Sequence, residues 1–414
     1  MNVNTGYLNP LGTDLPALFA GLSEGKWYLM ESQRLLLLGD RGRKWFLENE
    51  QALVSPHESD FYNRNLQQRF PVIMNFYPEE FHLSMKRRYS AILGKGALSK
   101  LEDHFRKAAS NLFKTHRPKG PVDLFQIVAQ AVVGGQLQLF FSLKADKSSL
   151  ASLVDYEDLF TLGLYADAAT QELWYAQSRF LHAEEVFLRM YRSAEEKVCE
   201  LGLFADRNPS AASDFGAMSH FYNLSVAGST NVAKLTCEVV ESASKMGNRL
   251  EALIQGGGIQ SAASHLIKEA LRLLPWTENQ ITPPYLNRMS SAQIQLADSV
   301  CFPKGSQVYL LHCLEHMSEK LFPEPSSFMP ERWLTTSHES IALFTFGVGR
   351  RKCCGEALVT IWLRALVEEY LKQCRFEFED EISYKPYNPA ICDVGEFSFR
   401  GVLAGKPDLL KDSR

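Results

Sequence analysis

The spacing of apolar residues along the chain predicts a mainly helical protein with a few short strands. Near the N-terminus, residues 26–31 and 34–39 are short apolar-rich runs separated by two residues, a pattern typical of paired strands. A helix is predicted to follow over residues 41–48. From about residue 79 to residue 204, apolar residues recur at helical spacing with charged residues between them.

Residues 214 to about 249 contain no proline and predict one very long helix. Its middle, residues 221–233, is small and apolar, so we expect this helix to cross the core rather than lie on the surface. After Pro275 the pattern changes to prolines and short β-like runs, interrupted by a helix at about 355–374. We find no repeat and no linker-like tract, and therefore expect one continuous domain over residues 1–414. The β-like runs cover residues 306–311, 376–378 and 397–403.

Composition narrows the class of protein. Hydrophobic residues make up 45% and charged residues 22% of the 414 residues, as in ordinary soluble globular proteins. The net charge of −4 gives no basic excess, so we expect no nucleic-acid partner. Residues 1–19 are interrupted by proline, glycine and aspartate, which excludes a secretory signal or membrane anchor there. Eight scattered cysteines without a C-x-x-C pair predict reduced thiols and a cytoplasmic location.

The segment F-G-V-G-R-R-K-C-C-G, residues 346–355, holds the strongest candidate chemistry. Cys353 lies just before a predicted helix and next to Arg350 and Arg351. The helix dipole and these cations lower the pKa of the thiol and favour a thiolate. Such a thiolate suits a metal ligand or a nucleophile, and the alternative is a buried structural cysteine.

This segment resembles the haem-binding loop F-x-x-G-x-R-x-C-x-G of the cytochrome P450 family. The resemblance implies a P450 fold, mainly α with small β-sheets, and haem b as cofactor. Cys353 would be the axial thiolate of the haem iron, a ligand that favours O–O cleavage. Arg351 would reach a haem propionate, Phe346 would pack near the sulfur, and Cys354 falls on a variable position. The matching residues are Phe346, Gly349, Arg351, Cys353 and Gly355.

Other segments resemble the family in the same order along the chain. Glu269 and Arg272 match its E-x-x-R helix, and Arg332 matches the arginine of its P-E-R segment, so the resemblance implies a network of the three. Taken alone, glutamate and arginine at this spacing are more often a solvated ion pair. Residues 302–305 and 316–325 resemble the strand-turn and the meander of the family.

Two further sites toward the haem propionates follow from the resemblance. His82 and Lys86 match an H-x-x-x-R helix, with lysine in place of arginine. Lysine can pair with a carboxylate but offers no bidentate fork. Arg288 lies where a second propionate-binding arginine is expected. Each of these cations could equally be an ordinary surface residue.

Residues 227–231, A-G-S-T-N, resemble the A-G-x-D/E-T stretch of the family's distal helix. Ala227 and Gly228 would leave room for dioxygen. The acid and alcohol positions are occupied by Thr230 and Asn231, so this stretch lacks the carboxylate that guides protons to oxygen. Both side chains can still hold a hydrogen bond or a water. A core helix with a satisfied asparagine is the alternative.

One motif points to different chemistry. Residues 312–316, H-C-L-E-H, match the H-x-x-E-H signature of zinc hydrolases. That chemistry needs both histidines on one helical turn, whereas this segment follows a predicted strand and runs toward Pro323 and Pro325. We therefore expect no zinc site.

The resemblance implies a monooxygenase that oxidises a mostly apolar small organic molecule, with a role in secondary metabolism. Ferredoxin and ferredoxin reductase would supply electrons, and Arg350 and Lys352 are candidates for docking an acidic donor. Two alternatives stay open: an atypical catalyst of coupling, isomerisation or dehydration, suggested by Thr230 and Asn231, or a haem-binding protein without turnover. The substrate pocket would comprise residues 71–77, 277–287 and 394–397 with Phe221, Tyr222, Leu224, Ser225 and Ala227.

Overall fold

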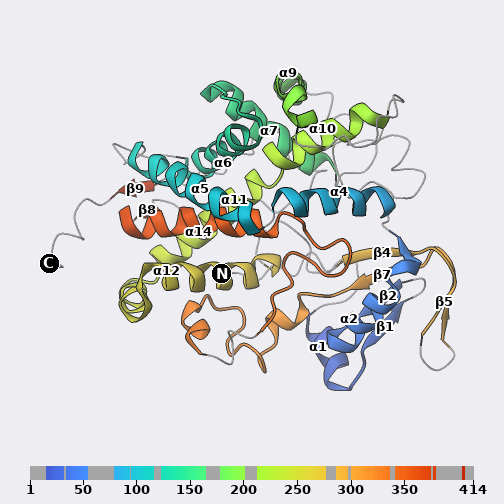
Figure 1. Ribbon diagram of the computed structural model, residues 1–414. Helices are drawn as coiled ribbons and strands as arrows, with labels where there is room; N and C mark the ends of the chain where they lie inside the picture. Colours follow the sequence, from blue (N-terminus) through green and yellow to red (C-terminus); the bar gives the residue numbers. More distant parts are fainter. Residues whose placement is uncertain are drawn as a thin grey trace. The chain divides into compact units, whose positions relative to one another are not determined.

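The chain folds into two compact units, each assembled from separate stretches of sequence (Figure 1). The sheet unit comprises residues 1–70, 74–87 and 268–354, and the helical unit comprises residues 71–73, 88–267 and 355–414. The computed structural model describes residues 15–31, 34–54, 79–93, 95–115, 123–164, 178–200, 212–276, 286–296, 300–335, 341–373, 376–378 and 403–405.

A five-stranded sheet forms the centre of the sheet unit, in the order β1-β2-β7-β4-β3. β2 runs parallel to β7, and the other neighbours are antiparallel. The predicted pairing of the first two apolar runs is confirmed, because β1 and β2 form an antiparallel hairpin. The strands are β1 (Tyr28–Glu31), β2 (Arg34–Leu37), β3 (Leu53–Val54), β4 (Leu286–Ser290) and β7 (Gln307–Leu310), with a separate pair β5 (Ile294–Gln295) and β6 (Cys301–Phe302).

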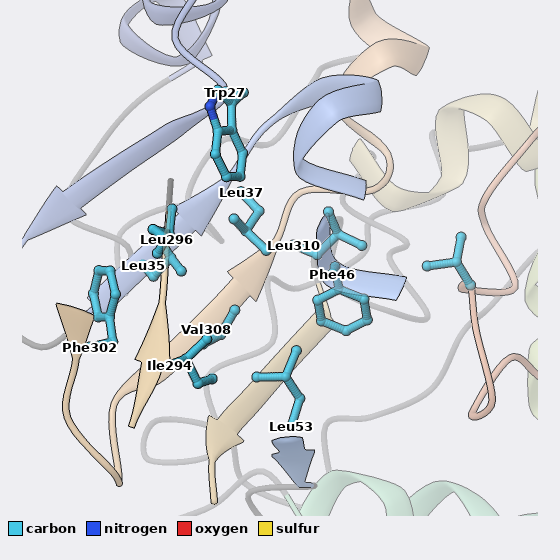
Figure 2. Close-up of a cluster of buried hydrophobic side chains, with 11 residues drawn as sticks. Trp27, Leu35, Leu37, Phe46, Leu53, Ile294, Leu296, Phe302, Val308 and Leu310 are labelled. Atoms are coloured by element: carbon cyan, nitrogen blue, oxygen red, sulfur yellow. The ribbon is translucent and has the colours of Figure 1, made fainter. Parts of the chain in front are cut away.

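Both faces of this sheet are buried, which explains why β2 and β7 are apolar after their first residues, Arg34 and Gln307. Leu35 and Leu37 point to one face and Leu36 to the other, as the two-residue period of a strand requires. The first face packs against Phe46 of α2 (Gly39–Glu48) (Figure 2). The second face packs against α1 (Leu15–Ser23), η5 (Leu274–Trp276) and η7 (Leu314–Met317).

Short helical turns and the ends of two long helices complete the sheet unit. The turn η2 (Glu50–Ala52) precedes β3, and η8 (Pro330–Leu334) contains the P-E-R segment. The first part of α4 (Glu79–Ile92), up to Arg87, belongs to this unit. So does the last part of α12 (Asn248–Leu273), from Lys268.

The helical unit is a bundle in which α6 and α11 lie at the centre (Figure 1). α6 packs against α5, α7, α10 and α11, and α14 packs against α5 and α11. Close approach is possible because Gly135 of α6 faces the ring of Trp362, which stacks on Phe105 at 3.9 Å. The elements are α5 (Lys95–Thr115), α6 (Leu124–Phe141), α7 (Lys147–Leu164), α9 (Ser178–Glu200), α10 (Ala212–Ser225), α11 (Ser229–Ser244), α14 (Glu356–Gln373), β8 (Phe376–Phe378) and β9 (Leu403–Gly405).

Among the described helices, α6 is long and apolar enough to cross a membrane, judged by length and composition alone. Its apolar side chains are largely buried against its neighbouring helices. α6 therefore has the packing of a core helix.

The prediction of one continuous helix from residue 214 to about 249 is wrong. The helix stops at Ser225, and α11 begins at Ser229 after a turn over 226–228. The N–H groups of Val226 and Ala227 both donate to the carbonyl of Tyr222, and Gly228 has φ of +83°. A left-handed glycine interrupts the helical hydrogen-bond ladder, although the apolar periodicity continues across it. We call residues 226–228 the helix break.

Candidate functional site

The loop that contains Cys353 is a closed structure with an exposed cysteine at its end. Gly347 and Gly349 have φ of +78° and +74°, which lets the backbone reverse direction twice. The N–H of Cys353 donates to the carbonyl of Phe346 at 2.9 Å and closes the loop. Cys353 is exposed, whereas Cys354 is half-buried. The loop thus presents the Cys353 thiol outward, three residues before α14 begins.

Two charged side chains from distant segments hold the backbone of this loop. Glu50, which is 7% exposed in η2, accepts a hydrogen bond from the N–H of Arg350 at 2.7 Å. Lys86 of α4 donates to the carbonyls of Arg350 and Lys352, both at 2.7 Å. Burial lowers the pKa of the Lys86 ammonium. The sequence carried no signal for Glu50, and it assigned Lys86 to a haem propionate rather than to these carbonyls.

The other predicted cofactor residues of the sheet unit lie on separate elements. His82 is buried on α4, one turn before Lys86. Arg288 of β4 is 9% exposed, and its guanidinium lies 6.0 Å from the ring centre of Phe46 and donates to the carbonyl of Asn287. Phe346 and Arg351 are half-buried in the cysteine loop. In the helical unit, the carbonyl of Gly355 accepts the N–H of Val359 in the first turn of α14.

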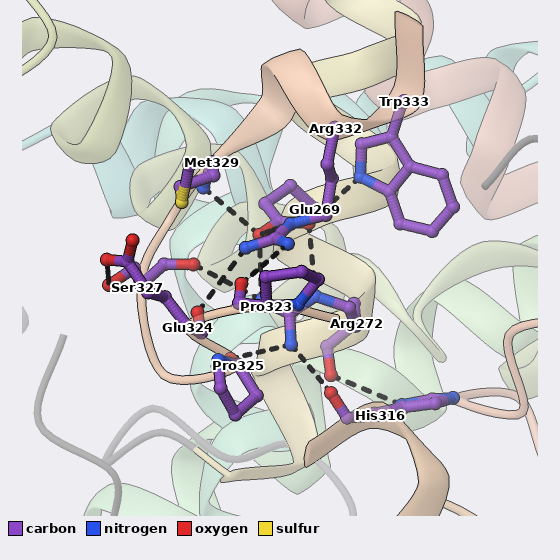
Figure 3. A network of polar contacts seen from close by, with 10 residues as sticks. All are labelled: Glu269, Arg272, His316, Pro323, Glu324, Pro325, Ser327, Met329, Arg332 and Trp333. Carbon is purple, nitrogen blue, oxygen red and sulfur yellow. Dashed lines mark hydrogen bonds and ion pairs between the residues drawn. The ribbon is translucent and has the colours of Figure 1, made fainter. Parts of the chain in front are cut away.

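The structure joins the three residues of the predicted network in one buried cluster (Figure 3). Glu269 accepts from Arg272 at 2.7 and 3.1 Å and from Arg332 at 3.1 Å. The side chains of Glu269 and Arg272 are fully buried. Trp333 Nε1 and the N–H of Met329 also donate to the Glu269 carboxylate, at 2.9 and 3.1 Å. The solvated ion pair considered from the sequence is therefore excluded.

Arg272 extends the network to the meander that precedes η8. Its guanidinium donates to the carbonyls of His316 and Pro325, each at 2.7 Å (Figure 3). Five-donor arginine suits this position, because two acceptors lie on the glutamate and others on the backbone. The network consequently fixes residues 316–325 against the end of α12.

The histidines of the zinc-like motif have structural roles. His316 Nδ1 lies 3.2 Å from the carbonyl of Arg272, and His316 Nε2 accepts the N–H of Phe344 at 3.1 Å. Burial lowers the pKa of His316 to about 3, so the ring is neutral with its proton on Nδ1. Glu315 is paired with Arg43 at 2.9 Å. Within the described ranges, no three histidine, cysteine, aspartate or glutamate side chains form a group that could hold a metal ion.

The helix break in the helical unit is bound by a carboxylate that the sequence did not reveal. Glu157 of α7 is 3% exposed. It accepts hydrogen bonds from the N–H of Gly228 and the hydroxyl of Ser229, both at 2.5 Å, and from the N–H of Thr230 at 2.9 Å. Burial raises the pKa of Glu157 to about 7, although these three hydrogen bonds favour the ionised form.

The remaining predicted residues of the distal segment differ in exposure. The Thr230 side chain is buried, whereas Ala227, Gly228 and Asn231 are half-buried. Phe221 and Tyr222 are buried in a cluster of aromatic rings that includes Phe187, which favours core packing for both. Leu224 and Ser225 are also buried. The predicted pocket segments 71–77, 277–285 and 394–397 lie outside the described residues.

Comparison with known sequences finds relatives of the C-terminal part. A family model described as Cytochrome P450 matches residues 263–391. The chain is 33% identical over 127 residues to 25-hydroxyvitamin D-1 alpha hydroxylase, mitochondrial, of Homo sapiens, covering 30% of this chain and 23% of that protein. It is 33% identical over 118 residues to Cytochrome P450 monooxygenase flvC of Aspergillus flavus, covering 28% of this chain and 21% of that protein. The match thus spans less than a quarter of either relative.

Comparison with solved structures covers nearly the whole chain. P450BioI in complex with hexadec-9Z-enoic acid ligated acyl carrier protein matches with a TM-score of 0.64 and 14% identity, covering 97% of both chains. A thermophilic cytochrome P450 from Sulfolobus tokodaii matches with a TM-score of 0.62 and 16% identity, covering 88% of this chain and 93% of that one. At this identity the similarity establishes the fold, mainly helical with small sheets. The fold is that of these cytochrome P450 structures, and the part of the chain that matches the Cytochrome P450 family model contains Glu269, Arg332 and Cys353.

Proposed function

We propose that this protein is a haem-thiolate monooxygenase that binds haem b through Cys353. The observation that carries the proposal is the cysteine loop, in which an exposed thiol ends a turn fixed by two left-handed glycines, Glu50 and Lys86. The donor set fits the group. A thiolate is a suitable axial ligand for haem iron, and the cationic Arg288 and Arg351 of the same unit suit the propionates.

When bound, the haem supplies the iron at which dioxygen is reduced by two electrons, one oxygen atom entering the substrate and the other leaving as water. The residues of the chain fix the ligand for this chemistry. The hydrogen bond from Cys353 N–H to Phe346 and the contacts of Glu50 and Lys86 hold the loop in one conformation. A preorganised ligand loop loses little conformational entropy on binding.

The Glu269–Arg272–Arg332 network supports the same unit at a second point. Its buried charges are satisfied only while η8, the meander and the end of α12 keep their positions. Separating one partner would leave a buried charge without its counterion, at a cost of about 3–5 kcal/mol. We therefore assign the network a scaffold role for the loop side of the haem site.

The substrate we propose is a mostly apolar small organic molecule. P450BioI is bound to a fatty acid carried by acyl carrier protein, and a cyanobacterial structural neighbour is bound to retinoic acid, at 15% identity and a TM-score of 0.65. Both ligands are long and apolar. We also propose a single P450 domain over residues 1–414, ferredoxin and its reductase as electron donors, and the exposed Arg350 as a contact for that donor.

An optical spectrum tests the ligand assignment. Cys353→Ala is expected to abolish the thiolate-type spectrum of the reduced, carbon-monoxide-bound protein, and Cys354→Ala is expected to keep it. The reverse result would move the ligand to Cys354. A wild-type protein that shows no thiolate-type spectrum after haem reconstitution would refute the proposal as a whole.

The second candidate is an atypical P450 catalyst of coupling, isomerisation or dehydration. The observation that favours it is the segment Thr230–Asn231, which carries no carboxylate of its own. Product formed under isotope-labelled dioxygen separates the two candidates, because a monooxygenase transfers one labelled atom into the product. An unlabelled product would favour the atypical catalyst.

A further inference from the structure

We propose that Glu157 is the positioning residue of the helix break: a carboxyl brought from α7 that holds residues 228–230 in place and releases them when it loses its proton. The proposal rests on the proposed function, since it assigns Ala227, Gly228 and Thr230 to the oxygen-binding side. It concerns a residue that lies outside every motif of the sequence.

The helix break needs a hydrogen-bond acceptor for its N–H groups that its own side chains do not provide. The first N–H groups of a helix have no intrahelical acceptor, and a side chain at the N-cap position normally supplies one. Here the N-cap of α11 is Gly228, which has no side chain. Glu157 takes that role from another helix and binds the N–H groups of both Gly228 and Thr230. α7 and the break are thereby held together by three contacts of one side chain.

Both protonation states of Glu157 are compatible with these contacts, but the ionised state has the higher free energy of desolvation. A neutral carboxyl can donate its O–H to Ser229 Oγ and still accept from the two N–H groups. An ionised carboxyl accepts all three hydrogen bonds, yet it must remain without bulk water in a buried site. Losing the proton therefore favours any opening that lets water reach the carboxylate.

The charged neighbours of Glu157 are already paired with one another. Asp158, whose carboxylate also disfavours ionisation of Glu157, lies 3.5 Å from Lys234 of α11. Asp155 of α7 is paired with Arg179 of α9 at 2.6 Å. The sequence of α6 contains no charged residue, and His220 of α10 is 2.8 Å from Tyr89 Oη. Because burial raises the pKa of Glu157 from its ordinary value of 4.5 to about 7, the free energy that keeps the break closed falls as the pH rises through this range and changes little above it.

The consequence for function is control of the break by proton binding. While Glu157 keeps its proton the turn is held, and Ala227 and Gly228 keep the position seen in the structure. As the pH rises toward about 7, α7 and the break separate more often. Turnover should decline over the same pH range, through kcat rather than KM.

Amide hydrogen exchange on the haem-loaded protein tests this without turnover. After correction for intrinsic rates, the protection of the Gly228 and Thr230 amides in the wild type is expected to fall about tenfold between pH 6 and pH 8. Glu157→Gln should remove this pH dependence and should weaken protection of Thr230 at both values, because its NH₂ group accepts no hydrogen bond. The matched control Asp155→Asn, two residues earlier on α7 and paired with Arg179 of α9, should behave like the wild type.

The pH profile of turnover supplies the functional readout. The decline of kcat as the pH rises from about 5 to about 7 should be present in the wild type and in Asp155→Asn and absent from Glu157→Gln. Protection that does not change between pH 6 and pH 8, or that responds equally to both substitutions, would overturn the assignment. A missing thiolate-type spectrum would refute the proposed function but leave the exchange result to decide the role of Glu157.

Discussion

Glu50 Oε1 accepts the backbone N–H of Arg350 at 2.7 Å, although the two residues are 300 positions apart in the sequence. The contact joins the turn before β3 to the loop that presents Cys353. A buried carboxylate on a backbone N–H is a strong, charge-assisted hydrogen bond. The conformation of the ligand loop therefore depends on a residue from the N-terminal part of the chain.

Glu50→Ala is expected to weaken haem binding and lower the stability of the sheet unit. The substitution removes the charged acceptor of the Arg350 N–H, and a hydrogen bond to a charged group contributes about 1.5–3 kcal/mol. Haem content after purification and chemical denaturation measure the two effects. The exposed Glu48, two residues earlier on α2, supplies the control, and equal behaviour of Glu48→Ala and Glu50→Ala would contradict the role of Glu50.

Gly349→Ala is expected to disturb the ligand loop more than a backbone effect alone can explain. At φ of +74° any side chain is strained, and a Cβ at this position would also collide with the Glu50 carboxylate. Gly305→Ala isolates the first effect, because Gly305 has φ of +88° and open space around it. We expect Gly305→Ala to lower the free energy of unfolding by about 1–2 kcal/mol and Gly349→Ala to lower it clearly more, as measured by urea denaturation. Matching losses for the two variants would disprove the collision.

Glu269→Ala is expected to be among the most destabilising single substitutions in the sheet unit. It leaves the guanidinium groups of Arg272 and Arg332 without their shared carboxylate in a buried site, at a cost of about 3–5 kcal/mol. Thermal and urea unfolding measure this loss. Glu319, exposed on the meander, provides a control substitution that should change stability little. A loss below about 1 kcal/mol for Glu269→Ala would show that the cluster is not the support we infer.

His316 is expected to make the sheet unit sensitive to acid. Its folded-state pKa of about 3 lies below the ordinary value of 6.5, so the unfolded chain binds a proton that the folded chain excludes. Its contribution to stability is complete above about pH 6.5 and is lost as the pH falls toward 3, at about 1.4 kcal/mol per pH unit within that window. Unfolding of His316→Gln between pH 4 and pH 7 should show a shallower slope than the wild type. The exposed His182→Gln should keep the wild-type slope, and an unchanged slope in His316→Gln would oppose the assignment.

Patterns within short stretches of the sequence were sufficient to predict several elements of the structure. The two short apolar-rich runs over residues 26–31 and 34–39 predicted paired strands, and β1 and β2 are paired in the structure. The cysteine loop could be located because its residues are contiguous. The spacing of Glu269 and Arg272 likewise predicted a pair on one helical face, and in the structure the two side chains form a buried ion pair.

Features that depend on distant contacts could not be predicted in this way. Glu50 and Glu157 reach their partners from segments far away in the sequence, and nothing near either residue marks it as special. The helix break was missed because Gly228 resembles any small residue in an apolar helix until its φ is known. The role of Lys86 was set by the position of the loop carbonyls rather than by its own spacing.

The parallel pairing of β2 with β7 also has a consequence for how the protein is made. Arg34 of β2 aligns with Gln307 of β7, so the N-terminal hairpin leaves the ribosome long before its sheet partner exists. At bacterial or eukaryotic synthesis rates, this delay is on the order of ten seconds to a minute. A two-stranded hairpin is barely stable by itself, and its open edge invites pairing with other nascent chains. Efficient production of this protein should therefore benefit from slower translation or from added chaperones that shield that edge until β7 emerges.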